Sequence, residues 1–297
     1  MTICLKGSKM EILVTGSSGF IGKSLCRRLM KDGHHVWGLD ITKPDIPIDY
    51  LILDITHPEI ITHPIWEGIN HVYHLAAMAN LDEARENNLK CLMLNVEGTR
   101  NIVECCRKFH IPLTYISTCC VYGATTEHPT TETAPTYPTE IYGQTKLMGE
   151  LFVKTLPRYT ILRYSTVIGP EMRAALATYI FLTQASKKVP FTIHGNGQQT
   201  RSWVFIDDLI EATVKSLAVQ DNQVFNIAGF ESPTVLQVAT WAAEVIGVEP
   251  KFTFLPDRPG QVFHEEISIE KVKRMLDWEP KNSVKEALRK SWEGMQH

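Results

Sequence analysis

The chain has 297 residues, with 30 lysines and arginines against 33 aspartates and glutamates and a formal net charge of −3. This length suffices for one large α/β domain, or for a domain with a smaller lobe, without disulfides. Because the charge is nearly balanced and has no long run of one sign, the composition argues against a broad surface for nucleic acid. A small molecule or a second copy of the chain is the expected partner.

The cysteine content indicates a reducing environment. The seven cysteines are an odd number without any CxxC pair, and no secretory signal is recognisable at the start of the chain. We therefore expect a cytoplasmic location and no metal site. No segment approaches the roughly 18 to 20 uninterrupted apolar residues that cross a bilayer, so no membrane partner is expected. Residues 1–9 are expected to form a short extension ahead of the first strand.

Short apolar runs alternate with longer amphipathic stretches over about the first 165 residues, which is the pattern of βαβ units that feed a parallel sheet. Strands are expected at residues 10–15, 34–39, 50–53, 71–76, 113–117 and 159–164. Helices are expected at residues 20–31, 89–108 and 142–156.

Beyond residue 165 prolines separate shorter elements, and helical spacing recurs at 233–247 and 283–295. This change predicts a smaller C-terminal α/β lobe, mainly over residues 166–297, that would bind the substrate. The chain is expected to return to the main sheet at about 200–230. Residues 1–165 would form the cofactor-binding domain.

Three glycines follow the first predicted strand, in the segment ILVTGSSGFIGKSL. Gly16 would allow a sharp turn, Gly19 would let a pyrophosphate approach the backbone, and Gly22 would let the helix pack closely on the strand. The phosphate would face the positive end of the helix that starts at Phe20 and Ile21. A glycine triad alone is a weak signal, but its position between a strand and a helix predicts a Rossmann-type, doubly wound parallel sheet.

Polar and small residues follow the next strands at the edge where such sheets bind ligands. Asp40 comes 18 residues after Gly22, where its carboxylate would accept hydrogen bonds from a ribose and repel a 2′-phosphate, so NAD is favoured over NADP. Asp54 and Ile55 are expected to meet the adenine. Small residues after the fourth strand would let the cofactor lie against the backbone, and we assign this role to Leu75, Ala76 and Ala77.

The segment YGQTK places Tyr142 and Lys146 one turn apart on one face of a helix. A phenol is a poor base at its ordinary pKa of about 10. A nearby ammonium favours the phenolate, so Lys146 would draw the pKa of Tyr142 toward neutral pH. Such a pair is common, and in isolation it would indicate only an exposed helical surface.

The pair does not stand alone, because further motifs occur in one order along nearly the whole chain. They are TGSSGFIG, Asp40, HLAA, NVEGT, STCCVYG, YGQTK, LRYSTVIGP, TRSWVFIDDL, FNIAG, RPGQ and WEP. With these motifs the sequence resembles the extended short-chain dehydrogenase/reductase family, and within it the NAD-dependent nucleotide-sugar epimerase/dehydratase group. The set is specific for the family and much less so for the reaction.

The resemblance implies roles for individual residues. Tyr142 would be the general acid/base, Lys146 its activator and a cofactor anchor, and Thr118 the hydroxyl that binds the sugar hydroxyl being oxidised. Asn95 and Ser117 would lie on the cofactor side.

The resemblance also implies a diphosphate site on the substrate side. Arg201 and Arg258 match ligands of the sugar-nucleotide diphosphate, and planar guanidinium groups suit phosphate oxygens. Either arginine could instead form a surface ion pair. Thr166 stands where many relatives have an asparagine that contacts the diphosphate, so either Thr166 substitutes for it or the ligand sits differently.

The cysteine pair in STCCVYG separates the reactions of the family. Relatives that dehydrate or decarboxylate the sugar carry carboxylates at the positions of Cys119 and Cys120, and a thiol replaces a proton-transferring carboxylate poorly. We therefore expect a 4-epimerase that works on a UDP-sugar through a transient 4-keto sugar. The alternatives are a keto-sugar reductase, a UDP-uronate decarboxylase and a non-catalytic NAD-binding sensor. The two cysteines would pack inertly or form a neutral wall of the pocket.

The predicted helices 89–108 and 142–156 carry apolar residues beyond one core-facing stripe. Relatives pair such helices between two subunits, so a homodimer is expected.

Overall fold

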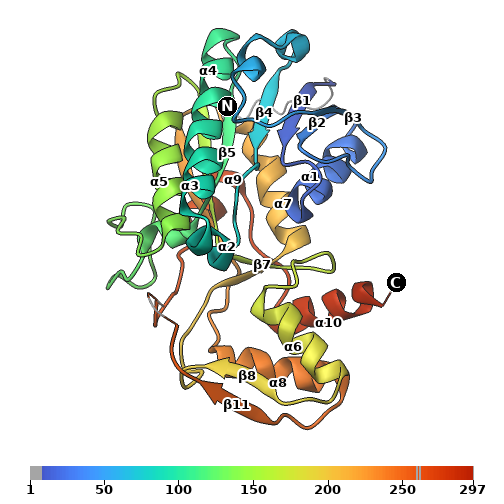
Figure 1. Ribbon diagram of the computed structural model, residues 1–297, viewed down its shortest axis with the longest axis vertical. Helices are drawn as coiled ribbons and strands as arrows, with labels where there is room; N and C mark the ends of the chain where they lie inside the picture. Colours follow the sequence, from blue (N-terminus) through green and yellow to red (C-terminus); the bar gives the residue numbers. More distant parts are fainter. Residues whose placement is uncertain (1–8, 259, 261, 297) are drawn as a thin grey trace.

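The computed structural model describes residues 9–258, 260 and 262–296. Apart from Lys9, the expected N-terminal extension lies outside the described residues. Figure 1 shows a larger part built on a parallel sheet, with a smaller lobe below it. The larger sheet has seven strands in the order β10-β6-β5-β4-β1-β2-β3. This order reverses direction between β1 and β4, as in a Rossmann-type fold, so the predicted fold class is confirmed.

All pairings of neighbouring strands in this sheet are parallel. Its strands are β1 (Glu11–Thr15), β2 (His35–Asp40), β3 (Asp49–Ile52), β4 (His71–His74), β5 (Leu113–Thr118), β6 (Tyr159–Tyr164) and β10 (Gln223–Ile227). The last strand belongs to the later part of the chain, so the chain does return to the main sheet there.

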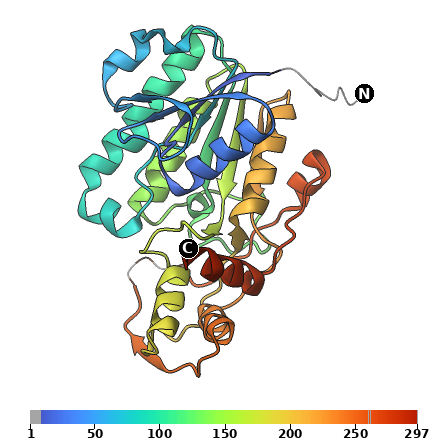
Figure 2. The same cartoon turned by 90° about the vertical axis from the view of Figure 1, so that its right-hand side faces the viewer.

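Helices cover both faces of the sheet (Figures 1 and 2). Alternate side chains of β1 enter two different cores, because successive side chains of a strand point to opposite faces. Ile12 and Val14 pack in the core that includes residues of α1 and α7, and Leu13 packs in the core that includes residues of α4 and α5. The bounds of these helices are α1 (Phe20–Lys31), α4 (Thr99–Lys108), α5 (Ile141–Val153) and α7 (Ile206–Lys215).

The smaller lobe contains a parallel pair of strands and two packed helices. The strands are β8 (Phe191–His194) and β11 (Phe252–Leu255), and the helices are α6 (Ala177–Ser186) and α8 (Val235–Ile246). A capping box of Thr234 and Gln237 starts α8. The remaining elements are β7 (Thr166–Ile168), which pairs with β9 (Trp203–Phe205), and the helices α2 (Leu81–Glu86), α3 (Asn88–Leu92), α9 (Glu270–Leu276) and α10 (Val284–Met295).

Two predicted elements differ from the structure. The helix expected at 89–108 stays helical throughout, but it includes a π-helical turn over Met93–Gly98 between α3 and α4. The strand expected at 71–76 ends at His74. The backbone nitrogen of Leu75 still donates to the carbonyl of Thr15, but that of Ala76 donates to the Thr15 hydroxyl instead of to a backbone carbonyl. Other ends differ by one to a few residues, such as that of α5 at Val153.

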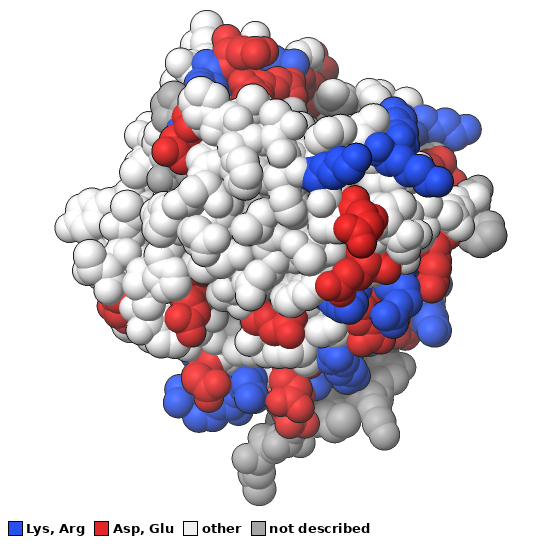
Figure 3. Space-filling model, turned by 90° about the horizontal axis from the view of Figure 1, so that it is seen from below, with Lys and Arg blue, Asp and Glu red and all other residues white. Residues whose placement is uncertain are grey.

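Within the described residues, no helix combines the length and apolar character needed to cross a bilayer. Figure 3 views the molecule from the end of the smaller lobe and shows a broad uncharged face with acidic and basic side chains at its margins. That face has no basic stripe of the kind that binds nucleic acid.

Candidate active site

The glycine turn after β1 has the shape expected of a phosphate cradle. Gly16 has a positive φ of 71°, and a β-carbon there would lie 2.8 Å from the backbone nitrogen of Ala76. Gly19 caps the N-terminus of α1, and its own nitrogen donates to the carbonyl of Gly16 at 3.1 Å. A β-carbon at Gly22 would overlap that same carbonyl. Only glycine fits this turn at both Gly16 and Gly22, so these residues fit the pyrophosphate of a dinucleotide.

Asp40 ends β2 beside the glycine turn. Its carboxylate accepts hydrogen bonds from the backbone nitrogens of Ser18 at 3.0 Å and Thr42 at 3.2 Å. These bonds fix the carboxylate next to the first turn of α1. This is the position that the expected ribose contact requires.

His74 organises the strand end that faces the glycine turn. Its Nδ1 lies 2.7 Å from the hydroxyl of Thr15, and its Nε2 lies 3.0 Å from the hydroxyl of Thr99. Complete burial lowers the pKa of His74 well below its ordinary value, so the ring is neutral. The Thr15 hydroxyl then holds Leu75 and Ala76 against Gly16.

Two of the predicted cofactor residues use their side chains to hold other elements. The buried amide of Asn95 accepts from the backbone nitrogen of Met78 at 2.7 Å and donates to the hydroxyl of Thr145 at 3.0 Å. The hydroxyl of Ser117 donates to Glu150 at 2.6 Å. Their side chains therefore join the strand ends to α5.

The residues expected near an adenine lie after β3. Asp54 accepts hydrogen bonds from the backbone nitrogen and the hydroxyl of Thr56, at 2.9 and 2.8 Å. Ile55 is buried and packs against Gly98. A β-carbon added to Gly98 would lie 2.6 Å from the terminal methyl group of Ile55. Phe20 packs likewise against Gly169.

Thr118 and Tyr142 meet where β5 ends and α5 begins. The Thr118 hydroxyl accepts from the backbone nitrogen of Cys120 at 3.2 Å. Burial raises the pKa of Tyr142, and the nearby thiol of Cys120 adds to this effect, whereas the charge of Arg173 and a hydrogen bond with Thr118 act to lower it. No sequence signal singled out Arg173, because its contribution depends on how the segment after β7 folds back.

Lys146 is almost completely buried, with 2% of its surface exposed. Its Nζ lies 4.1 Å from the centre of the Tyr115 ring, and the Tyr115 hydroxyl donates to the carbonyl of Lys146 at 3.3 Å. Burial lowers the pKa of Lys146 to about 7, although the charge of Glu150 opposes this fall. The ammonium is thus held over an aromatic face rather than exposed on the helix surface.

Cys119 and Cys120 differ in their surroundings but share one chemical state. Cys119 is buried and donates to the carbonyl of Arg163 at 3.4 Å. Burial raises the pKa of both thiols, so both stay protonated at neutral pH. In the part of the chain that the structure describes, six cysteines are free thiols.

Three of the predicted substrate residues, Thr166, Arg201 and Arg258, come from separate segments of the later part of the chain. The backbone nitrogen of Thr166 donates to Ser202 at 3.2 Å, next to Arg201. Arg258 is exposed and faces the carboxylate of Asp82 at 3.9 Å, so it makes the surface ion pair that the sequence left open. It also lines a cavity of about 420 Å³ with Asn196, Asp257, Gly260 and Phe263.

Glu265 is a carboxylate of this region that sequence reasoning missed. Its Oε1 accepts from the backbone nitrogen of Ser202 at 3.0 Å. Burial raises the pKa of Glu265, and the charge of Arg201 opposes this rise. The charge of Glu265 in turn raises the pKa of the thiols of Cys119 and Cys120. No motif marks Glu265, because its segment reaches the site only through tertiary folding.

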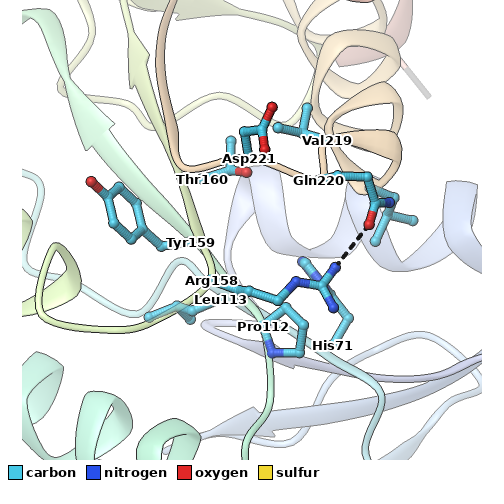
Figure 4. A pocket seen from close by; sticks show the side chains of 10 residues that line it. His71, Pro112, Leu113, Arg158, Tyr159, Thr160, Val219, Gln220 and Asp221 are labelled. Atoms are coloured by element: carbon cyan, nitrogen blue, oxygen red, sulfur yellow. Dashed lines mark hydrogen bonds between the residues drawn. The ribbon is translucent and has the colours of Figure 1, made fainter.

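A second cavity lies at the amino ends of the strands, at the edge of the sheet opposite to the glycine turn. It is lined by residues at the amino ends of β4, β5 and β6, among them His71, Leu113 and Arg158. Figure 4 shows Arg158 reaching toward Gln220, with Nη2 and Oε1 3.4 Å apart. Its volume of about 20 Å³ has room for about one water molecule, so it is not a candidate substrate site.

A comparison with protein-family models identifies the group to which this arrangement belongs. Residues 12–228, from β1 to just beyond β10, match the model of the NAD dependent epimerase/dehydratase family. The chain belongs to this family. The family expected from the sequence, with its NAD dependence, is therefore confirmed.

Proteins across the family are similar over most of the chain. An uncharacterized UDP-glucose epimerase of Bacillus subtilis is 29% identical over 94% of this chain and 96% of its own length. UDP-glucuronic acid decarboxylase 4 of Arabidopsis thaliana is also 29% identical, over 96% of this chain and 68% of its own. The solved structure of a UDP-glucuronic acid 4-epimerase from Bacillus cereus, in complex with UDP-glucuronic acid and NAD, is 30% identical. The match covers 97% of this chain and 99% of the epimerase chain, with a TM-score of 0.88.

Proposed function

We propose that this protein is an NAD-dependent UDP-sugar 4-epimerase that works through a transient 4-keto sugar. The observation that carries the proposal is that Tyr142 and Lys146 lie one turn apart on α5, with Tyr142 bonded to Thr118 at the end of β5. Two similar proteins, from Bacillus subtilis and Bacillus cereus, are named as UDP-sugar epimerases.

Residues on the edge of the sheet would hold the cofactor. Gly16, Gly19 and Gly22 would bind the pyrophosphate and Asp40 the adenosine ribose. NAD held there would supply the hydride acceptor and donor for C4 of the sugar. The remaining contacts are proposed for Phe20, Ile21, Asp54, Ile55, Leu75, Ala76, Ala77, Asn95, Ser117, Tyr142 and Lys146.

The chain would supply the proton chemistry. Tyr142 removes the proton of the C4 hydroxyl and later returns it, which is general acid/base catalysis. Thr118 binds the same hydroxyl and keeps it within reach of Tyr142. Lys146 favours the phenolate form of Tyr142, because a positive charge lowers the pKa of a neighbouring phenol.

The substrate would lie between the sheet and the smaller lobe. Arg201 and Arg258 would bind the diphosphate, with Thr166 beside them, as their guanidinium groups suit phosphate oxygens. The cavity of about 420 Å³ beside Arg258 has a volume within the usual range for a small-molecule ligand. We propose that residues 1–165, together with β10, bind the cofactor and that residues 166–297 mainly bind the substrate.

The test is conversion without added cofactor. Purified protein is incubated with UDP-glucose, UDP-glucuronate and UDP-N-acetylglucosamine, and the products are identified by NMR. We expect a 4-epimer of at least one of them, and Tyr142→Phe is expected to lose about 10² to 10⁴-fold in rate while still binding substrate. Bound NAD without any product would contradict the proposal and favour the sensor. Net consumption of NADH would favour the reductase.

Glu265 favours a second candidate, a UDP-uronate decarboxylase. Its carboxyl has a raised pKa and lies near Cys120, so it could deliver the proton that a thiol delivers poorly. A similar protein from Arabidopsis thaliana is named as a UDP-glucuronic acid decarboxylase. Release of CO₂ from UDP-glucuronate, with no 4-epimer formed, would establish this function instead.

We also propose a homodimer. Apolar side chains are exposed on the neighbouring helices α3 and α5 and on the π-helical turn, and they are Leu89 (73%), Met93 (47%), Met148 (42%) and Leu151 (61%). Burying them against a second copy would remove this apolar surface from water. The free thiols support the cytoplasmic location. A monomer by light scattering at micromolar concentration would contradict the dimer.

A further inference from the structure

Glu150 lies on α5 one turn after Lys146 and two turns after Tyr142. Its side chain is completely buried. Arg163 donates to its carboxylate twice, from Nε at 2.9 Å and from Nη2 at 2.7 Å, and the hydroxyl of Ser117 donates at 2.6 Å. The carboxylate is therefore ionised and fixed in place by three hydrogen bonds.

Arg163 is itself held on its far side. Its Nη1 donates to the hydroxyl of Tyr122 at 2.9 Å, and that hydroxyl donates to Asn226 at 2.6 Å. The ion pair thus joins α5 to β6 and β10. Burial acts to raise the pKa of Glu150, but the hydrogen bonds and charge of Arg163 outweigh burial and keep this pKa below its ordinary value.

Glu150 is the described carboxylate whose charge acts on Lys146. The other titratable groups around the ammonium are Tyr115 of β5, His74 of β4 and Cys91 of α3, and Tyr142 lies one turn earlier on α5. Burial keeps Tyr115 and His74 neutral, and it raises the pKa of Cys91. Among the residues that the structure describes, no hydrogen bond is made by Nζ of Lys146, so the ammonium depends on the Tyr115 ring and on the field of Glu150.

We propose that Glu150 is a positioning residue that keeps Lys146 charged and so sets the pH at which Tyr142 works as a base. The inference rests on the proposed function, because it assigns Lys146 a role in activating Tyr142. A buried ammonium is unfavourable without a nearby anion. Removing the charge of Glu150 makes Lys146 neutral at pH 7, and the phenolate of Tyr142 then loses its stabilising cation.

The experiment is the pH dependence of epimerisation in the NAD-containing enzyme, with Glu150→Gln compared with the wild type between pH 6 and 10. The acid limb of the pH–rate profile of the variant is expected to move to higher pH by about one unit. The rate of epimerisation at pH 7 then falls about tenfold, and it returns to the wild-type rate at high pH. A loss of the same factor at every pH would overturn the proposal and leave Glu150 a structural residue.

Tyr122→Phe is the matched control. It removes a hydrogen bond on the other side of Arg163 and leaves the charge of Glu150 unchanged. Its acid limb is expected to coincide with that of the wild type. An equal shift in both variants would overturn the proposal, because it would trace the effect to loosening of the network.

Glu150→Gln leaves Arg163 without its buried partner, which is destabilising. The double variant Glu150→Gln/Arg163→Met removes both charges and keeps the test available if the single variant fails to fold. The pKa of Lys146 can also be titrated by NMR with ¹³C-labelled lysine, and Lys146→Arg assigns the signal. A wild type without epimerisation would count against the proposed function alone, whereas a Lys146 pKa unchanged in the variants would overturn the role of Glu150.

Discussion

A β-carbon added to Gly22 would overlap the carbonyl oxygen of Gly16, because the first turn of α1 packs directly on the end of β1. Gly22→Ala is therefore expected to cost about 1 to 3 kcal/mol of stability, the usual range for overpacking, and to reduce bound NAD. Thermal unfolding and the NAD released on denaturation measure the two effects.

Gly19→Ala separates binding from folding. Its backbone is extended, with φ of −76°, and a β-carbon would lie 3.3 Å from the nearest atom, the carbonyl oxygen of Gly16. We expect a melting temperature lowered less than in Gly22→Ala, together with weaker NAD binding, because the new methyl group stands where the pyrophosphate would approach. Wild-type NAD content in this variant would show that Gly19 does not form the cradle.

Asp40→Ser is expected to shift the cofactor preference toward NADP. The carboxylate beside the glycine turn would repel a 2′-phosphate, and a hydroxyl would not. Dissociation constants for NAD and NADP, measured on protein freed of its cofactor, check the change. An unchanged ratio of the two constants would mean that the ribose lies elsewhere.

His35 joins three strands through carboxylates, and its effect on stability depends on pH. Its Nδ1 is paired with Glu11 and its Nε2 lies 2.9 Å from Asp49. The hydrogen bonds to Glu11 and then to Asp49 raise the pKa of His35 above its ordinary value of 6.5. The stabilisation is therefore complete below about pH 6.5 and is lost as the pH rises through the raised value.

His35→Gln tests this dependence by urea unfolding at pH 6 and at pH 9. Because the three groups are partly exposed, the difference from the wild type at pH 6 should be about 1 kcal/mol or less, and it should shrink at pH 9. A difference that grows with pH would contradict the charged state of His35.

Leu151→Asp is expected to produce monomers, because a carboxylate in a buried apolar interface is strongly unfavourable. Leu151 is 61% exposed on α5. Met275→Asp on α9 is the control, since Met275 is also exposed but lies outside the proposed interface. Size-exclusion chromatography with light scattering distinguishes the two outcomes, and a Leu151→Asp dimer would place the interface elsewhere.

Local patterns were sufficient for much of the candidate site. Gly16, Gly22 and Asp40 follow strands whose apolar runs are visible in the sequence, and Tyr142 and Lys146 share a helix face by their spacing alone. Their neighbourhood in space follows from the rule that parallel strands end at one edge of the sheet. For this reason, the fold class and family could be predicted before any side chain was located.

Only the tertiary structure decided the electrical environment of these residues. Arg163 of β6 reaches Glu150 of α5, and Glu265 arrives from a segment far along the chain to meet Ser202. Asn95, in the π-helical turn, likewise bonds to Met78 and Thr145, which lie far from it along the chain. Burial and charge act through space, so the pKa values of Tyr142 and Lys146 depend on packing partners that no local pattern of residues specifies.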